Sequence, residues 1–520
     1  MSEFLSGLKN ELLDSPDNLS RTENGALGYK TTGKALMGLN FALSSLRNES
    51  EDDIWHRFLA AYNETPDLSV AWLFFSRDIR QGSGERRTFR VIFPRLADLN
   101  PALAEKLLAF IPEYGRWDDL VFVMDKIRAK TVQKAALSII SEQLRADLDS
   151  LNHGGSVSLL AKWLPSAVTS SKETRRLANI IRDALGMTPR QYRKTLSCLR
   201  RRIDIVEARM SANEWNQINY QGVPSRAMLN YRSAFGRHDQ DGFSAYLEKV
   251  KSGESKIHSG TLYPHDIYHA YAYSGRDDTL EAQWKALPNT VPPGQDTLVV
   301  VDGSGSMLSR VGNTALRAIE VSRGLGLYFA ERLHGPFKDH FITFSSRPQL
   351  VYLNPDLSLY TKINMIQQYD DCSNTDIEKT FDLILNTAVK NNLSQSELPA
   401  NVLIISDMEF DEATTAHMCT YEKDSTHSKL KTLFDTIADK FERAGYKLPR
   451  LIFWNVCSRT GTIPVRQNDL GVALVSGFSP NIADMVMSGK LDPWECLVDK
   501  LTSDRYQPIL NEVRSLHEHD

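Results

Sequence analysis

The spacing of apolar residues divides the chain into two parts with different secondary structure. From about residue 26 to about residue 290, apolar positions recur every three to four residues between short polar breaks, as in 54–59 and 103–110. This spacing predicts on the order of ten or more short helices and no strands. Stacked helical pairs build solenoids, so we predict an all-α, HEAT-like helical-repeat solenoid or ring, although no clean repeat period is visible.

From about residue 291 the pattern changes to short apolar runs that alternate with helical segments. The runs at 298–301, 402–405, 451–456 and 472–475 lack polar alternation, which is typical of strands buried on both faces of a parallel sheet. A hairpin-like pair is predicted at 341–344 and 350–353. Helices are predicted over 313–333, 376–390, 427–444 and much of 482–516. Alternating strands and helices predict a doubly wound α/β domain, which makes the chain multidomain.

These patterns predict three segments. Residues 1–25 are polar and form a flexible tail, residues 26–290 form the helical domain, and residues 291–520 form the α/β domain. Residues 286–295, ALPNTVPPGQ, carry three prolines and a glycine, and predict the linker between the two domains.

Composition changes this picture little. The net charge of −4 over 520 residues implies no particular partner. Five cysteines, an odd number and far apart, argue against a disulfide framework or a zinc site and predict a reducing, cytoplasmic setting. No basic start with an apolar core marks a signal peptide, and no apolar run approaches membrane-spanning length, so we expect no membrane partner.

The charge distribution is more informative than the net charge. Residues 153–238 hold 15 Lys and Arg against five Asp and Glu. Trp215, Tyr220 and Tyr231 lie among these cations. Guanidinium groups for phosphates and aromatic rings for bases are the usual chemistry of single-stranded RNA binding. The alternative is that the arginines are solvated helix faces and salt bridges, which is the better interpretation for any single one.

As candidate RNA-binding residues we select cations, with one histidine, from the clusters of the helical half. They are Arg77, Arg80, Arg86, Arg87, Arg116, Lys162, Arg193, Arg200, Arg201, Arg202, Arg232 and His265.

Oxygen-bearing side chains follow two of the predicted core strands. The stretch Thr297–Met307, TLVVVDGSGSM, ends a strand with Asp302, Ser304 and Ser306, and Asp407 ends the run at 402–405. Thr375 precedes a predicted helix and supplies a hydroxyl. Since the carboxyl ends of parallel strands meet at one edge, these hard oxygens predict a site for Mg²⁺ or another divalent cation. An ordinary polar turn is the alternative for Asp-Gly-Ser-Gly-Ser alone.

A second motif at 28–35, GYKTTGKA, has the spacing of a phosphate-binding P-loop except at its end. Ala35 stands where a Ser or Thr would hold Mg²⁺, and no buried strand precedes the segment. We interpret it as an accidental match.

The metal-site pattern resembles the metal-ion-dependent adhesion site (MIDAS) of von Willebrand factor A domains, Asp-x-Ser-x-Ser, then Thr, then Asp. Five positions match: Asp302, Ser304, Ser306, Thr375 and Asp407. In that family the serines and the threonine touch the metal, the aspartates act largely through water, and an open position takes a partner's carboxylate. Most such adhesion modules are extracellular, so the cytoplasmic expectation disfavours cell–matrix adhesion here.

Most of the chain resembles the Ro autoantigen (TROVE) architecture, more specifically in the α/β domain than in the helical half. It resembles more closely a related family from bacteria, plants and viruses. The resemblance rests on RDIRQGSGERR (77–87), YGRWDDL (114–120), AKWLPS (161–166), EWNQINYQGVPS (214–225), IHSGTLYPHDI (257–267), VDGSGSM (301–307) and ISDMEFDEA (405–413). Ro proteins close a helical-repeat ring with the A domain, and bind small structured RNAs and single-stranded RNA ends. The resemblance implies a ribonucleoprotein of this kind, with no RNA-contact residue carried over.

Three functions compete. The leading hypothesis is a non-enzymatic RNA-binding protein whose α/β domain binds Mg²⁺. The alternative is a protein-interaction scaffold that uses the metal site to bind a partner's carboxylate. The third is a metal-dependent nuclease in which Glu409 and Asp411 place a second ion, but no nucleophile–base pair supports it.

Overall fold

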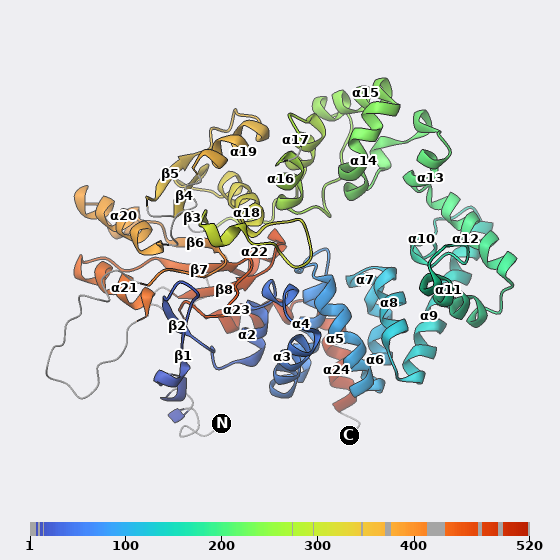
Figure 1. Cartoon of the computed structure of the whole chain (residues 1–520), viewed down its shortest axis with the longest axis horizontal. Coiled ribbons are helices and arrows are strands. Elements are labelled where there is room, and N and C mark those ends of the chain that lie inside the picture. The colour runs from blue at the N-terminus through green and yellow to red at the C-terminus, as the bar shows by residue number, and fades with distance from the viewer. Residues whose placement is uncertain are drawn as a thin grey trace. The chain divides into compact units, whose positions relative to one another are not determined.

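A computed structural model describes residues 7–8, 11–13, 15–272, 274–294, 296–344, 347–369, 376–412, 432–465, 471–486 and 492–517 (Figure 1). The chain forms two compact units. Unit 1 comprises residues 1–69 and 262–501, and unit 2 comprises residues 70–261 and 502–520. Both units are therefore built from segments that are far apart in the sequence.

Unit 1 is organised around a six-stranded sheet with the order β5-β4-β3-β6-β7-β8. Its strands are β3 (Thr297–Asp302), β4 (His340–Phe344), β5 (Gln349–Tyr352), β6 (Asn401–Ser406), β7 (Arg450–Asn455) and β8 (Val472–Ser476). All neighbours pair in parallel except β4 and β5. Every residue of β3, β6, β7 and β8 is buried, which explains why these strands are continuous apolar runs. The predicted doubly wound α/β fold is confirmed.

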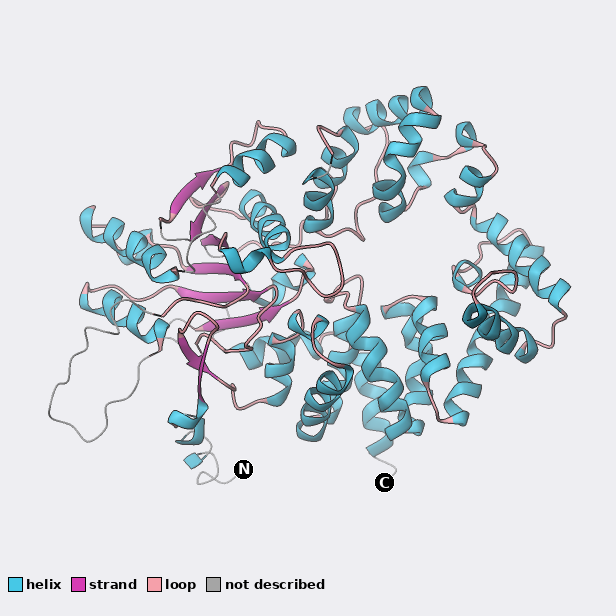
Figure 2. Cartoon of the chain, in the orientation of Figure 1, coloured by secondary structure: helices cyan, strands magenta, loops and turns pink. Residues whose placement is uncertain are grey.

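Helices of unit 1 cover this sheet (Figure 2), and most of them come from residues 262–501. Helix α18 (Ala318–Arg332) packs on β3, β4 and β6, and α20 (Ile377–Lys390) packs on β4 and on α21 (Leu433–Arg443). Helices α22 (Ala483–Val486) and α23 (Pro493–Leu501) lie against β8. Helix α19 (Leu359–Gln368) contacts α16 (Pro264–Ala272) and α17 (Asp278–Lys285).

Two glycines allow α18 to approach its neighbours closely. A Cβ at Gly326 would lie 2.4 Å from the Val301 side chain, and one at Gly324 would lie 2.9 Å from the His265 backbone nitrogen. Helix α16 is thereby fixed onto the α/β core. Residues 262–290, predicted to belong to the helical domain, are part of unit 1 for this reason.

The N-terminal segment also packs on the sheet, which corrects two predicted boundaries. Strands β1 (Leu19–Arg21) and β2 (Leu27–Tyr29) form an antiparallel hairpin, so residues 19–25 are not a loose tail. Helix α2 (Ala35–Phe41), followed by α3 (Glu51–Glu64), contacts β8. Asn455 Nδ2 donates to the Phe41 carbonyl (2.9 Å), and Ser476 Oγ donates to Ser44 Oγ (2.7 Å). Residues 26–69 therefore pack with the α/β core.

Unit 2 contains only helices among its described residues, as the apolar spacing predicted. Its first helix is α4 (Pro66–Arg77), whose first four residues are assigned to unit 1. Its other α-helices are α5 (Arg86–Leu99), α6 (Pro101–Leu107), α7 (Ile111–Tyr114), α8 (Trp117–Lys126), α9 (Lys130–Asn152), α10 (Leu160–Trp163), α11 (Lys172–Ala184), α12 (Pro189–Ile203), α13 (Val206–Ser211), α14 (Ser225–His238), α15 (Gln240–Ser252) and α24 (Gln507–His517). Most contacts join near neighbours in sequence, whereas α24 returns to pack on α6. No helix within the described ranges has the length and apolar character needed to cross a membrane.

A buried ion-pair cluster holds α4, α5 and α8 of unit 2 together. Arg77 is 2% exposed and its Nη2 lies 2.6 Å from Asp119 Oδ2, while Arg90 Nε lies 2.8 Å from Asp119 Oδ1. Burial raises the pKa of Asp119, but the charges of the two arginines outweigh burial and hold that pKa below its usual value.

We therefore predict that Asp119→Ala destabilises the protein strongly. The substitution leaves the Arg77 guanidinium buried without its counter-charge, and breaking such a pair costs about 3–5 kcal/mol. The free energy of unfolding in urea measures the loss. Glu113→Ala is the matched control, since Glu113 forms an exposed ion pair with Arg505 and should cost at most about 1 kcal/mol. Equal losses in the two variants would contradict the role of the buried cluster.

Candidate functional site

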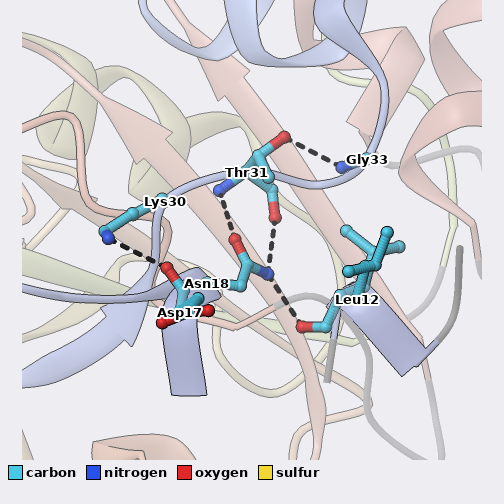
Figure 3. A pocket seen from close by; sticks show the side chains of 7 residues that line it. Leu12, Asp17, Asn18, Lys30, Thr31 and Gly33 are labelled. Carbon is cyan, nitrogen blue, oxygen red and sulfur yellow. Dashed lines mark hydrogen bonds between the residues drawn. The ribbon is translucent and has the colours of Figure 1, made fainter. Parts of the chain in front are cut away.

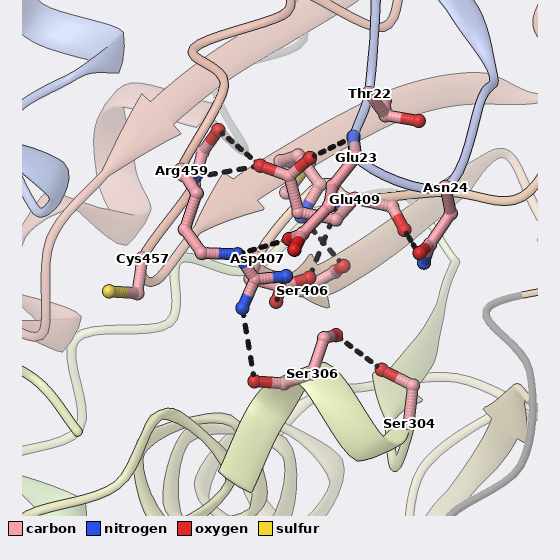
Figure 4. A network of polar contacts seen from close by, with 12 residues as sticks. Thr22, Glu23, Asn24, Ser304, Ser306, Ser406, Asp407, Glu409, Cys457 and Arg459 are labelled. Carbon is pink, nitrogen blue, oxygen red and sulfur yellow. Dashed lines mark hydrogen bonds and ion pairs between the residues drawn. The ribbon is translucent and has the colours of Figure 1, made fainter. Parts of the chain in front are cut away.

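The first part of the site is the loop that follows β3. Asp302 ends the strand and is fully buried, and its Oδ1 accepts a hydrogen bond from the Ser304 backbone nitrogen (2.9 Å). A short 3-10 helix over Gly305–Leu308 follows, and the Ser304 and Ser306 hydroxyl oxygens lie 2.9 Å apart (Figure 4). The loop thus brings one carboxylate and two hydroxyl groups together.

The second part follows β6, the neighbour of β3. Ser406 Oγ donates to Asp302 Oδ2 (2.5 Å), which ties the two strand ends together. Asp407 is fully buried, and its Oδ1 accepts from the Glu409 backbone nitrogen (3.3 Å). Asp407 Oδ2 is buried and has no hydrogen-bond partner in the described part of the chain. The chain runs outward in opposite directions from β3 and β6, so this is the switch point where α/β folds bind ligands.

Four of the five predicted metal-site residues therefore meet at one edge of the sheet: Asp302, Ser304, Ser306 and Asp407. The fifth, Thr375, lies outside the described residues. The arrangement fits a small divalent cation, because it combines hard oxygens with a buried carboxylate oxygen that accepts no hydrogen bond from the described residues.

The pKa shifts of the two aspartates also indicate that this site needs a positive charge. Burial raises the pKa of Asp302 above its usual range, and the nearby Asp407 raises it further. Burial also raises the pKa of Asp407, while a hydrogen bond with the Ser306 side chain and the charge of Arg459 act in the opposite direction. Two buried carboxylates so close together need a positive charge before both can ionise.

Arg459, which the sequence reasoning missed, supplies part of that charge. Its Nη2 lies 3.6 Å from Asp407 Oδ2, and its Nη1 donates to the Ser306 carbonyl at 3.4 Å. Its Nε lies 2.5 Å from Glu23 Oε2, on the N-terminal hairpin (Figure 4). The residue follows β7, the next strand in the sheet, so the strand-end argument that selected Asp407 was the available signal.

Glu409 is occupied by hydrogen bonds and is not arranged as a ligand for a second ion. Its side chain is fully buried, and Oε1 accepts from the backbone nitrogens of Arg459 (2.7 Å) and Thr460 (2.9 Å) and from Ser458 Oγ (3.2 Å). Its Oε2 accepts from the Glu23 backbone nitrogen (2.8 Å). Glu409 thus joins the loops after β6 and β7 to the hairpin.

The P-loop-like segment 28–35 does not form a phosphate-binding loop. Its backbone nitrogens already donate within the protein: Tyr29 to the Ile463 carbonyl (2.8 Å), Thr31 to Asn18 Oδ1 (3.1 Å) and Gly33 to Thr31 Oγ1 (3.0 Å). A cavity of about 350 Å³ beside it is lined by residues of the 12–33 segment (Figure 3). The interpretation of the motif as an accidental match agrees with these contacts.

Burial removes two of the predicted RNA-binding residues from the candidate set. Arg77 belongs to the buried ion-pair cluster with Asp119 described above. His265 is 5% exposed and packs on the ring of Phe478 in unit 1. Both side chains are buried between packed elements, and the sequence alone does not show which face of a helix is buried in this way.

Several other candidates bond to backbone carbonyl groups and help to hold unit 2 together. Arg200 donates to the carbonyls of Ala161 and Leu164, both at 2.8 Å, and Arg202 donates to those of Gly155 (3.1 Å) and Gly154 (2.6 Å). The same holds for Arg80, which donates to the Glu113 carbonyl, and Arg232, which donates to that of Leu229 (2.5 Å).

The remaining candidates keep access to solvent. Arg116 and Lys162 both lie 5.7 Å from the centre of the Trp163 ring. Arg86 is exposed with Asp118 at 4.0 Å, and Arg87 is half-buried. Arg193 and Arg201, both on α12, are exposed and form no hydrogen bond or ion pair with any other described residue.

Helix α12 carries two further cations of this kind. Arg190 and Lys194 are exposed and equally without a partner in the described part of the chain. The helix begins with a capping box between Thr188 and Gln191, and buries Tyr192, Leu196 and Leu199 on the opposite face. Its solvent face thus presents four cations that are unpaired among the described residues, of which the sequence analysis had selected Arg193 and Arg201.

Comparisons with known proteins connect both units to sequence families. A domain of unknown function (DUF7788) matches residues 296–507, and another domain of unknown function (DUF2828) matches residues 130–292. The first covers all six strands of the α/β sheet, and the second covers α12 and its neighbours.

The uncharacterized protein L728 of Acanthamoeba polyphaga mimivirus is 28% identical to this chain over 529 residues, and covers 95% of this chain and 89% of L728. This similarity agrees with the predicted resemblance to a family that includes viral proteins. The crystal structure of the Deinococcus radiodurans Ro (RSR) protein matches 79% of this chain and 92% of its own, with 14% identity and a TM-score of 0.35. A likeness this low carries no argument on function.

The buried aspartates generate a prediction on pH. A carboxyl group whose pKa is raised by folding binds more protons in the folded state than in the unfolded state. Its contribution to stability is therefore present below the unfolded pKa of about 4 and is lost as pH rises through the raised folded pKa. In chelator-treated protein, Asp302→Asn should reduce the loss of unfolding free energy between pH 5.5 and pH 8 by on the order of 1 kcal/mol or more.

Thermal and urea unfolding at the two pH values measure this difference. Asp356→Asn is the control, because Asp356 is an exposed carboxylate of the same unit and should leave the pH dependence unchanged. An unaltered pH dependence in Asp302→Asn would contradict the burial argument.

Proposed function

We propose that this chain is a non-enzymatic RNA-binding protein of the Ro type, which grips RNA through the cations of unit 2. The observation that carries the proposal is the solvent face of α12. Arg190, Arg193, Lys194 and Arg201 are exposed and unpaired among the described residues, whereas most neighbouring arginines are bound. Unpaired guanidinium and ammonium groups are free to replace the counterions of a phosphate backbone.

The salt-bridge alternative holds for other arginines of this unit. Arg176 pairs with Glu173 and Asp125, Arg182 with Asp183, and Arg209 with Asp204 and Glu214. Salt bridges do not account for the four α12 cations, which have no acidic partner among the described residues. Trp215, which stacks on His238 with ring centres 4.2 Å apart, adds a partly exposed aromatic surface to the same unit.

RNA binding should weaken steeply with salt and depend on α12. We predict that replacing Arg190, Arg193, Lys194 and Arg201 together by Gln reduces the slope of log affinity against log salt by about 2 to 3, because each lost phosphate contact of a single strand contributes about 0.7. Anisotropy titrations with a single-stranded and a hairpin RNA measure the slope.

The control is Arg176→Gln with Arg182→Gln, two arginines of α11 whose charges already have acidic partners. It should change the slope by less than about 0.5. Binding to neither RNA, or binding that is insensitive to salt, would overturn the proposal.

We further propose that unit 1 binds Mg²⁺ or a similar divalent cation. Asp302, Ser304, Ser306 and Asp407 would hold it, with Thr375 as the fifth residue of the pattern. Two observations support the assignment: Asp407 Oδ2 lacks a hydrogen-bond partner among the described residues, and the two aspartates repel each other. When bound, such an ion supplies a positive charge that neutralises this edge and offers a coordination position to an outside ligand.

Cation binding should raise the melting temperature of chelator-stripped protein, and Ser304→Ala with Ser306→Ala should abolish that rise while leaving the fold intact. At 100 times the dissociation constant the bound ion stabilises the protein by about 2.7 kcal/mol. Thermal unfolding with added Mg²⁺ and titration calorimetry with Mn²⁺ measure the effect.

The double variant Ser170→Ala with Ser233→Ala, which changes exposed serines of unit 2, should keep the full response. An unchanged cation response in the Ser304 and Ser306 variant would refute the assignment. Loss of RNA binding in that variant would contradict the separation of the two sites.

A second candidate function is a protein-interaction scaffold that binds a partner's carboxylate at the proposed metal site. It is favoured by the Glu23 carboxylate, which already lies on Arg459 beside Asp407. An absorbance ratio at 260 and 280 nm raised by co-purified nucleic acid favours RNA binding over this candidate. Catalysis has little support, because Glu409 is engaged by five donors and not arranged for a second ion.

A further inference from the structure

A cavity of about 610 Å³ lies between α12, α13 and the loop at 166–167 of unit 2. Its volume falls in the range of about 300–1,000 Å³ that small-molecule sites occupy. Four arginines line the cavity, and two of them, Arg193 and Arg201, are exposed arginines of the solvent face of α12 that are unpaired among the described residues. The other two α12 cations, Arg190 and Lys194, do not line it.

The charges of this cavity do not cancel. Its lining contains four arginines and two acids, Asp204 and Glu214, which leaves a net charge of +2. Both acids are engaged by one arginine, since Arg209 Nε lies 2.9 Å from Asp204 and its Nη1 lies 3.1 Å from Glu214. No carboxylate of the lining is therefore left to neutralise Arg193 and Arg201.

The framework around these two side chains is fixed by hydrogen bonds. Arg200 is held by the carbonyls of Ala161 and Leu164, and Tyr192 Oη donates to the carbonyl of Pro165 (2.9 Å). Both contacts attach α12 to the segment that forms the opposite wall. The cavity is thus framed by hydrogen bonds between α12 and residues 161–165.

The lining is also divided in its chemistry. Leu196, Ala208 and Ala212 contribute an apolar wall, and Ser166 and Ser197 contribute hydroxyl groups. Arg193 and Arg201 are eight residues apart, about 12 Å along the helix axis, so their long side chains can converge from two sides on one anionic group that lies between them. An apolar wall for a base or sugar, with cations and hydroxyls for phosphate, matches a nucleotide better than a simple anion.

We propose that this cavity binds one phosphorylated nucleotide, with its phosphate held by Arg193 and Arg201. The inference rests on the proposed RNA binding, to which it adds a defined subsite on one side of α12. The nucleotide is supplied either by a phosphorylated end of an RNA strand or by a free mononucleotide, and the two sources share the same recognition chemistry.

The experiment compares two double variants of the full-length protein that remove equal charge from one helix. Arg193→Gln with Arg201→Gln empties the cavity of its unpaired cations, whereas Arg190→Gln with Lys194→Gln leaves the cavity intact. All four positions are exposed, so both variants should melt within a few degrees of the unmodified protein. Titration calorimetry with AMP, with adenosine as the uncharged comparison, reports the cavity directly.

We expect AMP to bind at one site per chain and adenosine to bind at least about tenfold more weakly, because adenosine lacks the charged group that accepts hydrogen bonds from the two arginines. The Arg193 and Arg201 variant should lose AMP affinity by about tenfold or more, and the Arg190 and Lys194 variant should stay within about twofold. Equal effects of the two variants on AMP, or no AMP binding, would overturn the proposal.

A second arm separates the two sources and the two proposals. Single-stranded RNA with a 5′-phosphate, compared with the same strand carrying a 5′-hydroxyl, should bind more tightly to unmodified protein if strand ends fill the cavity. A preference for AMP without such a difference assigns the cavity to free nucleotides. RNA binding that falls equally in both variants, with no AMP bound, refutes the cavity but preserves RNA binding by α12. AMP binding without RNA binding supports the cavity and refutes the proposed function.

Discussion

Two carboxylates buried side by side impose the main constraint on unit 1. Asp302 and Asp407 end neighbouring parallel strands at the point where the chain reverses direction across the sheet, and neither is exposed to water. Burying a charge is costly unless it is compensated, so the surroundings must provide donors or a cation. The Ser304 backbone, the Ser406 hydroxyl and Arg459 supply part of this compensation, but one Asp407 oxygen has no hydrogen-bond partner among the described residues. The need for positive charge follows from the sheet topology itself.

Unit 2 uses its cations in two opposite ways, and position on a helix decides between them. Arg200 and Arg201 are adjacent in sequence, yet the first is held by two carbonyl groups and the second is exposed and unpaired within the described structure. Successive residues of an α-helix point about 100° apart, so one arginine faces the packing of α10 while the next faces solvent. A cluster of arginines is therefore a mixture of structural and functional groups, and only the fold separates them.

The sequence was sufficient to predict the sheet and to predict that most of the candidate metal-site residues lie close together. Continuous apolar runs have one simple explanation, strands buried on both faces, and residues that directly follow such strands must meet at their carboxyl ends. Asp302, Ser304, Ser306 and Asp407 could therefore be predicted to lie together without any side-chain information. The positions of Glu23 and of the donors to Glu409 could not be predicted, because they depend on a hairpin and a loop whose contacts leave no periodic pattern.

The limits of the helical region were predictable only in part for a similar reason. Amphipathic spacing shows that a segment is helical and which face is apolar, but it does not identify the surface that covers that face. Residues 35–64 and 264–285 have the same pattern as unit 2, yet they belong to unit 1 together with the sheet. The contact between Phe41 and Asn455, more than 400 residues apart, has no local signature.

That distance has a consequence for how the protein is made. Ser44 bonds to Ser476, which is 432 residues later in the chain, and a ribosome adding about 5–20 residues per second needs roughly 20 to 90 s to deliver it. During this interval α2 and the N-terminal hairpin have emerged without the strand and loops that will cover them. Unit 2 is translated in between and receives its helix α24 last. The order of synthesis thus leaves the N-terminal segment without its β8 partner until most of the chain has been made, and its apolar surface is exposed to aggregation during that time.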